Sequence, residues 1–214
     1  MNKKFDIIGF VTAIAITIAI IIAAAKFTLN FRQLYYFDIS HLNIVSSSGL
    51  SRKEIKANYD YLIDYNKSSY KKDFHLPTLP YSREGKIHFE EVKKLFSSMD
   101  YLLILCLCLS IMGILFSLLI KSYKFLKYSS ITLLVFPTAL AIPFAINFDK
   151  SFTAFHKIFF NNDYWEFDPV KDPIINILPQ NFFFHCACLI LFIIVIFSLI
   201  FFFINRYVRK RAYR

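Results

Sequence analysis

"YLLILCLCLSIMGILFSLLI" occupies residues 101–120 and contains no charged side chain. The hydrocarbon core of a membrane is about 30 Å thick, and an α-helix rises about 1.5 Å per residue, so about 20 apolar residues can cross it. Three other runs lack charge in the same way: residues 7–25, 129–148 and 182–204. The sequence therefore predicts an all-α membrane protein with four transmembrane helices.

Composition agrees with this class. Of the 214 residues, 57% are apolar and 19% are aromatic, and only four are glycine. The apolar fraction exceeds that of ordinary soluble proteins. The first run could instead be read as a secretory signal, because Lys3 and Lys4 precede it. Its 19 residues are longer than the usual apolar region of such signals, about 7–15 residues. We therefore expect one integral membrane domain over residues 1–214.

The formal charge of +10 is unevenly distributed along the chain. If both termini are cytoplasmic, the inner segments hold ten bases and a single acid, Asp6, whereas the outer segments hold fifteen bases and fourteen acids. This follows the positive-inside rule, and it favours anionic membrane lipid over nucleic acid as the partner of the bases. The inner bases are Lys3, Lys4, Lys121, Lys124, Lys127, Arg206, Arg209, Lys210, Arg211 and Arg214.

This orientation leaves two segments outside, residues 26–100 and 149–181, which we expect to form a small extracytoplasmic cap of mixed or helical structure. The inner connections are a short loop and a basic tail. Because these inner segments carry few reactive groups, any chemistry should take place at the outer face.

Two stretches of the longer outer segment have opposite character. Residues 30–45, "NFRQLYYFDISHLNIV", are rich in aromatic and β-branched side chains and are predicted as a strand or an interfacial hairpin. Residues 51–66 begin with Ser51 and Glu54 at the spacing of a capping box, followed by an apolar helical face, and are predicted as a helix.

Prolines mark two other places. Residues 73–82, "DFHLPTLPYS", should form an irregular connector, and residues 86–100 then read as a helix that continues into the second span. Pro137 and Pro143 fall inside the third span, where each removes a backbone donor. Such prolines can kink a span and open a cavity, but they are also common in ordinary membrane helices.

All histidines are predicted outside or at the outer interface. His88 lies on one helical stripe with Val92, Leu95 and Met99, which turns its side chain toward the apolar side. A single such histidine is most often structural, but His88 and His156 both adjoin membrane exits, which favours a functional pair. The five histidines are His41, His75, His88, His156 and His185.

Carboxylates recur around His156. Asp149, His156 and Asp163 are spaced by sevens and would share a face if one helix continued past the membrane exit. Carboxylates so placed could fix the tautomer of the imidazole or raise its pKa.

The sequence gives little support for a metal site or for a covalent nucleophile. The histidines form no H-x-x-x-H or H-E-x-x-H pair, so no metal and no cofactor is predicted. The cysteine pairs at 106 and 108 and at 186 and 188 point in different directions on a helix, and cysteine packs well as a small apolar residue. No serine-nucleophile signature appears.

Aromatic side chains are dense at the predicted outer interface. Most can be explained as an interfacial belt, although their rings could also enclose a dry pocket around lipid chains. The residues predicted to line such a pocket are Tyr35, Tyr36, Phe155, Phe159 and Phe160.

Two motifs resemble a known family. Residues 148–183, "FDKSFTAFHKIFFNNDYWEFDPVKDPIINILPQNFF", are similar to the signature of the Firmicutes integral membrane proteins typified by lipoprotein intramolecular transacylase. Residues 88–96, "HFEEVKKLF", are similar to that family's His-x-x-Asp-Val-Lys block, with Glu91 where aspartate is expected. Four spans with an outer cap agree as well, so the resemblance covers essentially the whole chain.

The resemblance implies an activity and a partner. The family moves the sn-2 acyl chain of a diacylglyceryl-modified lipoprotein from its glyceryl group to the α-amino group of the same N-terminal cysteine, which gives the lyso form. Its two catalytic histidines map onto His88 and His156. The partners implied are diacylglyceryl lipoproteins and membrane lipid; the oligomeric state stays open.

The residues suit that chemistry. A neutral imidazole can take a proton from an attacking amine, and a second imidazole can protonate the departing oxygen. Which histidine plays which role stays open here. The side chains of Asp149, Asp163 and Glu91 could orient the imidazoles. The predicted donors to the tetrahedral oxyanion are Asn161, Asn162, Tyr164 and Trp165.

Two other classes of function stay open. A small membrane protein of this layout could bind or transport a lipid or peptide at its outer face, or could be a regulatory subunit without a site. The absence of charge in all four runs weighs against ion-coupled transport, which places ionisable groups near the membrane midplane.

Overall fold

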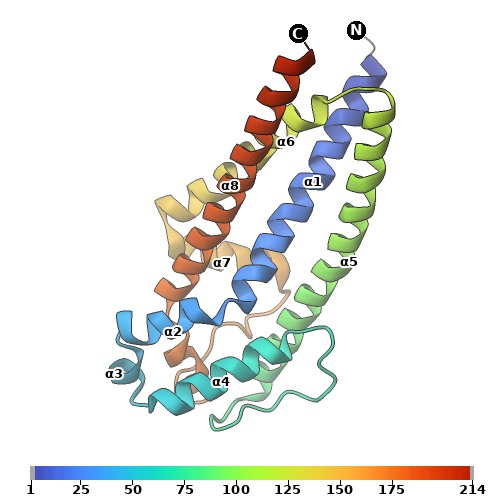
Figure 1. The fold of residues 1–214 in the computed structure, drawn as a ribbon. Helices are drawn as coiled ribbons and strands as arrows, with labels where there is room; N and C mark the ends of the chain where they lie inside the picture. Colours follow the sequence, from blue (N-terminus) through green and yellow to red (C-terminus); the bar gives the residue numbers. More distant parts are fainter. Residues whose placement is uncertain (1–2, 213–214) are drawn as a thin grey trace. The chain divides into compact units, whose positions relative to one another are not determined.

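A computed structural model describes residues 3–212 as helices joined by connections, of which 66–82 and 160–172 are the long ones (Figure 1). Arg214 lies outside the described residues, and so do the side chains of Lys3 and Lys4, which belong to the predicted inner charge. No strand occurs in the part of the chain that the structure describes, so the all-α prediction is confirmed. The elements are α1 (Lys3–Asn30), α2 (Arg32–His41), α3 (Ile44–Ser48), α4 (Arg52–Tyr65), α5 (Arg83–Leu119), α6 (Lys124–Ile146), α7 (Phe148–Phe159), the 3₁₀ helix η1 (Pro173–Ile177) and α8 (Gln180–Ala212).

The chain divides into two compact units. The bundle unit consists of residues 1–25, 101–145 and 189–214, and the cap unit consists of residues 26–100 and 146–188. The cap unit contains both segments that the sequence predicts as the outer cap. The prediction of a single membrane domain over the whole chain stays a prediction.

Four helices, α1, α5, α6 and α8, are long and apolar enough to cross a membrane, which confirms the predicted number of spans. The first part of α5 is charged up to Asp100, so the spanning part of this helix begins at Tyr101. Half of the apolar window of α1 is buried, against 11–22% in the other three helices. Within the bundle unit, α1 is therefore the central helix, and the other helices turn large apolar side chains outward.

Small and hydroxylated residues allow the helices of the bundle unit to approach closely. A Cβ atom at Gly113 of α5 would overlap the hydroxyl of Thr12 and lie 2.9 Å from its Cβ, so only glycine fits against α1. The hydroxyls of Thr17 in α1 and Thr132 in α6 lie 2.6 Å apart. Contacts of this kind are the usual means by which helices associate in a membrane.

The third predicted span ends earlier than expected. The uncharged run 129–148 extends past the end of α6, which contains Pro137 and Pro143 and ends at Ile146. Asn147 is extended, and its side chain accepts a hydrogen bond from the backbone N–H of Lys150 at 2.9 Å. This N-cap starts α7 as a separate helix, a signal that absence of charge alone does not reveal.

Residues 30–45 were predicted as a strand or hairpin, and this prediction is wrong. They form the end of α1, then α2 and the start of α3. Tyr35, Asp38 and Ile39 are buried at the spacing of one helical face, so their aromatic and β-branched character reflects core packing rather than strand pairing. Asn43 adopts a left-handed conformation with φ 53°, which separates α2 from α3.

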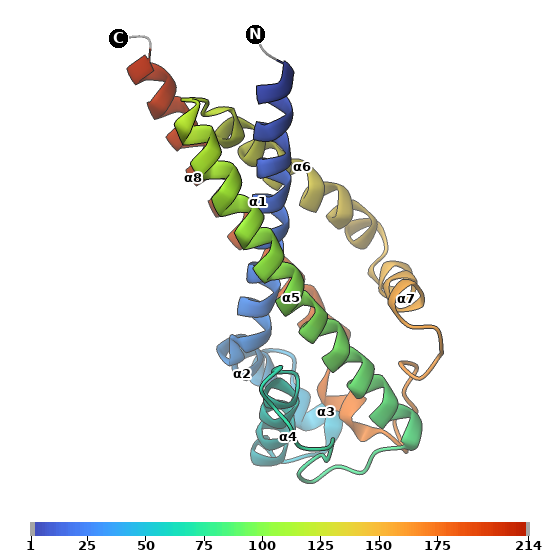
Figure 2. The ribbon, with the colours of Figure 1, turned by 90° about the vertical axis from the view of Figure 1, so that its right-hand side faces the viewer.

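The predicted helix over residues 51–66 is confirmed as α4. Glu54 N–H donates to the Ser51 hydroxyl at 3.3 Å and the Glu54 carboxylate accepts from Ser51 N–H at 3.0 Å, which completes the capping box. The apolar face of α4 enters a core shared with α2, η1 and the start of α8. α2 lies beside α4 in both views of the ribbon (Figures 1 and 2).

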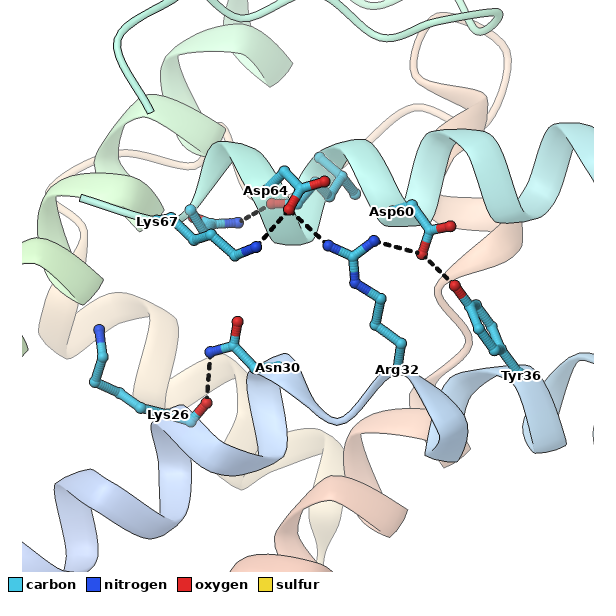
Figure 3. A network of polar contacts seen from close by, with 9 residues as sticks. Lys26, Asn30, Arg32, Tyr36, Asp60, Asp64 and Lys67 are labelled. Atoms are coloured by element: carbon cyan, nitrogen blue, oxygen red, sulfur yellow. Dashed lines mark hydrogen bonds and ion pairs between the residues drawn. The ribbon is translucent and has the colours of Figure 1, made fainter. Parts of the chain in front are cut away.

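A polar network joins the start of α2 to α4 (Figure 3). Arg32 contacts Asp60 at 3.2 Å and Asp64 at 2.6 Å, and the Tyr36 hydroxyl donates to Asp60 at 2.7 Å. Lys67, just beyond the end of α4, contacts Asp64 at 2.6 Å. The predicted connector 73–82 contains no helix, and the charged start of α5 continues without a break into its span, as predicted.

Candidate active site

His88 lies in the charged first part of α5, outside the spanning segment. Its side chain is only 5% exposed, as the apolar helical stripe predicts. Its ring packs edge-on against Phe160 and Phe167, with centroid distances of 4.9 and 5.4 Å. Its Nδ1 atom has no hydrogen-bond partner among the described residues. A buried polar atom without a partner is costly, and active sites are a common place for one.

His156 lies in the last part of α7, which begins at the Asn147 cap. The histidine is 8% exposed and is the buried residue of this otherwise more exposed helix. Its Nδ1 atom lies 2.7 Å from the carbonyl oxygen of Phe152, one turn earlier. Because a carbonyl can only accept, this contact places a proton on Nδ1 and leaves Nε2 with a lone pair when the ring is neutral.

The two imidazoles lie next to each other within the cap unit. Their ring centroids are 5.9 Å apart and the ring planes are inclined by 35°. Burial lowers the pKa of His88 to about 4, with a smaller contribution from neighbouring His156. Burial also lowers the pKa of His156, partly opposed by its hydrogen bond to Phe152. Both rings are therefore neutral near pH 7, the form that can accept a proton.

Two hydrogen-bonded contacts and one ring contact connect α5 to His156. The Asn162 side-chain amide donates to the Glu91 carboxylate at 3.0 and 3.2 Å, and the Asn162 backbone carbonyl accepts from the indole N–H of Trp165 at 3.1 Å. The indole ring lies 4.7 Å from the His156 ring, centroid to centroid. Three of the residues predicted to support the site, Glu91, Asn162 and Trp165, are thus brought together at the imidazole pair.

These contacts change the expected roles of the predicted oxyanion donors. The Asn162 side-chain amide and the Trp165 indole N–H already have partners within the protein. We therefore expect them to orient the indole ring and not to donate to the oxyanion. Asn161 and Tyr164 are exposed next to them. Neither has a side-chain hydrogen bond to another described residue, so both stay available as donors.

The expected shared face of Asp149, His156 and Asp163 is wrong for Asp163. α7 ends at Phe159, and Asp163 lies in the turn that follows, where its carbonyl accepts from the backbone N–H of Glu166. Asp149 is exposed in the first turn of α7. The atom that fixes the His156 tautomer is therefore the Phe152 carbonyl and not a carboxylate.

The predicted aromatic residues divide into two groups. Phe160 is buried and contacts both imidazole rings, at 4.9 Å from His88 and 5.7 Å from His156. The Phe155 ring lies 5.4 Å from the His156 ring, and the more exposed Phe159 ring lies 4.7 Å from that of Phe155, centroid to centroid. Phe160 and Phe155 therefore lie against the imidazole pair and Phe159 lies one ring further out; that these residues line a substrate pocket stays a prediction.

Tyr35 and Tyr36 belong to the core of α2 and α4 instead. Tyr35 stacks on Tyr59 at 3.7 Å and donates to the Ile177 carbonyl, and Tyr36 donates to Asp60. Two rings that touch the imidazoles were missed. Phe152 lies 4.2 Å from His156, one helical turn away, a spacing that could have identified it; Phe167 lies beyond the helix, where no periodicity points to it.

The other histidines lie elsewhere. His185 Nδ1 lies 2.9 Å from both oxygens of buried Asp38, with the His41 ring 5.8 Å away, and His75 contacts the Tyr81 hydroxyl. The residues that the structure describes contain no group of three or more His, Cys, Asp or Glu side chains able to hold a metal ion. All four cysteines are free thiols. Within these residues, the His88–His156 pair is where general acid–base chemistry is best supported by geometry.

The fold and the site define a class: an all-α integral membrane protein with four spans and a buried pair of neutral imidazoles walled by aromatic rings. A model of the family described as lipoprotein intramolecular transacylase Lit matches residues 10–183. The chain belongs to the lipoprotein intramolecular transacylase family and is a membrane acyltransferase.

Solved structures agree with this assignment. The membrane integral lipoprotein intramolecular transacylase Lit from Bacillus cereus is 40% identical, with a TM-score of 0.94, and the match covers 99% of each chain. Two variants of that protein, with one histidine replaced by arginine or by alanine, match with TM-scores of 0.90 at 40% identity. These matches cover 98% of this chain and 94% and 96% of the variants. Comparison with curated protein sequences gives no significant match.

Proposed function

We propose that this acyltransferase moves the sn-2 acyl chain of a diacylglyceryl-modified lipoprotein to the α-amino group of its N-terminal cysteine, with His88 and His156 as catalytic residues. The observation that carries this proposal is the pair itself. Two almost fully buried imidazoles, from α5 and α7, lie 5.9 Å apart between their ring centroids. That spacing is suited to a single ester group with an amine on one side and a leaving oxygen on the other.

His156 is the proposed general base. With its Nδ1 proton held by the Phe152 carbonyl, its Nε2 lone pair can accept a proton from the attacking amine. An α-amino group titrates at about 7.7–8.0, so a fraction is already neutral and nucleophilic near pH 7, and the base removes a proton as the N–C bond forms.

His88 is the proposed donor to the oxygen side of the reaction. Its lowered pKa keeps the ring neutral, and a neutral imidazole N–H can donate to a developing oxyanion or to the departing sn-2 oxygen. Its unpartnered Nδ1 supports this role, since a substrate group would supply the missing hydrogen bond. The altered histidine in the Bacillus cereus variants stands at nearly the same place in its chain as His88 does here.

No protein nucleophile is needed in this mechanism. Donor and acceptor belong to one molecule, and a correctly folded substrate can react with an effective molarity of about 10⁵ M or more. The aromatic wall formed by Phe160, Phe155 and Phe152 can hold the glyceryl group folded back toward the amine. Asn161 and Tyr164 are the proposed donors that assist His88 at the oxyanion.

The proposal also includes an orientation and two kinds of partner. Both termini are placed in the cytoplasm, and the site acts at the extracytoplasmic face, where diacylglyceryl lipoproteins present their N-terminal cysteine. Phe202, Asn205, Arg206, Arg209 and Lys210 of α8 line a surface recess of about 500 Å³. Its cationic side chains suit the headgroups of anionic lipids in the inner leaflet.

Mass spectrometry of a reporter lipoprotein tests the function. Because the transfer is intramolecular, substrate and product have equal mass, so the N-terminal peptide must be fragmented to show where the acyl chain sits. In a host that lacks other N-acylation, His88→Ala and His156→Ala should each abolish N-acylation. His75→Ala, which removes an exposed histidine of the connector, is the matched control and should retain it. Full activity in both site variants ends the proposal.

A further inference from the structure

The segment that follows α7 is held against α5 at two places. The first is the Asn162 amide, which donates to the Glu91 carboxylate at 3.0 and 3.2 Å. We call residues 162–172 the covering segment, because they run from this contact to a second one near the start of α5. Within the segment, Asp172 N–H donates to the Asp168 carbonyl at 2.8 Å, which closes its last turn.

The second contact is made by Asp172, which is 3% exposed. Its Oδ1 atom accepts from Ser82 N–H at 2.8 Å, just before α5 begins, and the Ser82 hydroxyl in turn accepts from Gly85 N–H at 2.9 Å. A Cβ atom at Gly85 would overlap Oδ1 of Asp172 and lie 2.9 Å from its Cγ. The absence of a side chain at Gly85 is therefore what lets the carboxylate reach the helix end.

The two contacts flank His88 on one face of α5. Gly85 precedes His88 by three residues and Glu91 follows it by three, and residues three apart are neighbours on a helix surface. The covering segment is therefore fixed to α5 about one turn on either side of the catalytic imidazole.

Between its two ends, the covering segment contributes two aromatic rings that contact the imidazole pair. The Trp165 ring lies 4.7 Å from His156, and the Phe167 ring lies 5.4 Å from His88 and stacks on Phe89 at 5.5 Å. Neither ring has an acid–base function. Their effect is to cover the imidazoles with apolar surface.

We infer that the covering segment determines which nucleophile the site accepts: it favours the tethered amine of the substrate over water, and Gly85, Asp172 and Glu91 are positioning residues for this selection. The inference rests on the proposed function. In the favoured reaction, the amine nitrogen bonds to the acyl carbon and the bond from that carbon to the sn-2 oxygen breaks. His156 takes the amine proton, and the departing oxygen receives one proton through His88, so both imidazoles end the reaction neutral.

Hydrolysis is the competing reaction at the same carbon. Water replaces the amine, the same ester bond breaks, and the products are a free fatty acid and a glyceryl hydroxyl beside an unmodified amine. His156 can activate water as readily as an amine, so acid–base chemistry alone does not prevent this outcome. Exclusion of water by the rings does.

The ratio of the two products is the measurement that tests the inference. Purified full-length enzyme in lipid is given a synthetic diacylglyceryl lipopeptide, and fragment spectra count N-acylated and deacylated peptide. Asp172→Ala and Glu91→Ala each release one end of the covering segment, and each should raise the ratio of hydrolysis to transfer about tenfold, which corresponds to about 1.4 kcal/mol between the two barriers. Glu91→Gln keeps an acceptor for Asn162 and should stay near the wild-type ratio.

Gly85→Ala tests the steric part. Alanine is the better helix former by about 0.8–1.0 kcal/mol, so a changed ratio in this variant does not come from a weaker helix. It comes from displacement of Asp172 or of the Phe167 ring, whose Cε1 atom would lie 3.2 Å from the added Cβ. In the double variant Gly85→Ala with Asp172→Ala, the methyl enters the space of the removed carboxylate. If displaced Asp172 is the cause, the product ratio of this variant should equal that of Asp172→Ala alone, whereas a higher ratio would trace to Phe167. Glu84→Ala, exposed in the same helical turn, is the control and should match the wild type.

The product ratio does not depend on how much enzyme folds, since both products come from active molecules. If Gly85→Ala fails to accumulate, Asp172→Ala and Glu91→Ala carry the test, because neither introduces an overlap. An unchanged ratio in both variants, with or without slower turnover, overturns the inference and leaves the proposed function intact. Absence of N-acylation by the wild-type enzyme would instead overturn the proposed function itself.

Discussion

The environment of His88 makes its protonation unfavourable in the folded protein. A histidine ordinarily titrates near 6.5, and burial lowers the pKa of His88 to about 4. Between these two values an unfolded chain holds a proton on this residue that the folded chain does not. The folded state therefore loses stability as the pH falls through this window and keeps it above pH 6.5.

This difference predicts an acid-sensitive stability. From pH 7 to pH 4, the wild-type protein should lose roughly 3 kcal/mol more than His88→Gln, since each pKa unit corresponds to 1.36 kcal/mol. Thermal unfolding in detergent at the two pH values measures the loss for each protein. Equal losses would mean that His88 is not held neutral by its surroundings. His75→Gln, at an exposed site, should behave like the wild type.

In the proposed mechanism, Trp165 acts through both its ring and its indole N–H. Trp165→Phe keeps a ring over His156 but loses the bond to the Asn162 carbonyl, so transfer should slow by about 2- to 10-fold, the value of one ordinary hydrogen bond. Trp165→Ala also loses the ring and should slow transfer further. Initial rates on the lipopeptide measure both, with Tyr101→Phe, at an exposed position, as the control. Equal rates in the two Trp165 variants would contradict a role for the ring.

At the scale of elements, the pair Asp38–His185 joins α2 to the first turns of α8. The Asp38 carboxylate is fully buried and both of its oxygens lie 2.9 Å from His185 Nδ1. Removing one partner of a buried pair leaves the other without compensation. The contact therefore contributes to the stability of the cap unit rather than to the chemistry of the imidazole pair.

We expect His185→Ala to destabilise the protein by about 3 kcal/mol, at the low end for buried pairs because the His185 side chain is 28% exposed. Lys86→Ala, which removes an exposed ion pair with Glu90 at 3.8 Å, should cost less than about 1 kcal/mol. Thermal unfolding in detergent compares the two. An effect of His185→Ala as small as that of Lys86→Ala would show that Asp38 finds another partner.

The elements that could be predicted from the sequence are those whose signals are local. The Ser51–Glu54 box starts α4, uncharged length marks the spans, and the stripe through His88 predicts its burial. Residues 30–45 could not be assigned in this way, because their aromatic side chains serve a core that forms only when α2 packs on α4. β-Propensity describes such residues poorly when their burial is helical.

The site was predictable in part for the same reason. His88 and His156 could be identified from spacing and from their place beside the apolar runs, and the family resemblance singled out the same two residues. Gly85 and Asp172 could not, since each appears ordinary by itself and their contact joins positions far apart in the chain. The same holds for Phe167, which reaches His88 from outside any helix.

At the scale of the whole molecule, the distribution of charge predicts the orientation in the membrane. The two terminal segments and the loop between α5 and α6 together carry ten bases and one acid, so this side of the protein, with both termini, should be cytoplasmic. Green fluorescent protein fused to either terminus should fluoresce, and alkaline phosphatase inserted in the connector 73–82 should be active outside. Inactive phosphatase together with non-fluorescent fusions of the green fluorescent protein would show the opposite orientation. The site would then face the cytoplasm, away from exported lipoproteins.

The spacing of the two contacts on α5 has a consequence for how chains of this family can diverge. Glu91 lies six positions after Gly85, a rise of about 9 Å along the helix, and each added or lost residue would turn one contact by about 100° relative to the other. Exchange of glutamate for aspartate is compatible with this register, whereas insertion or deletion between the contacts is not. In related chains, the residue types between these two positions should therefore vary while the number of residues between them stays constant.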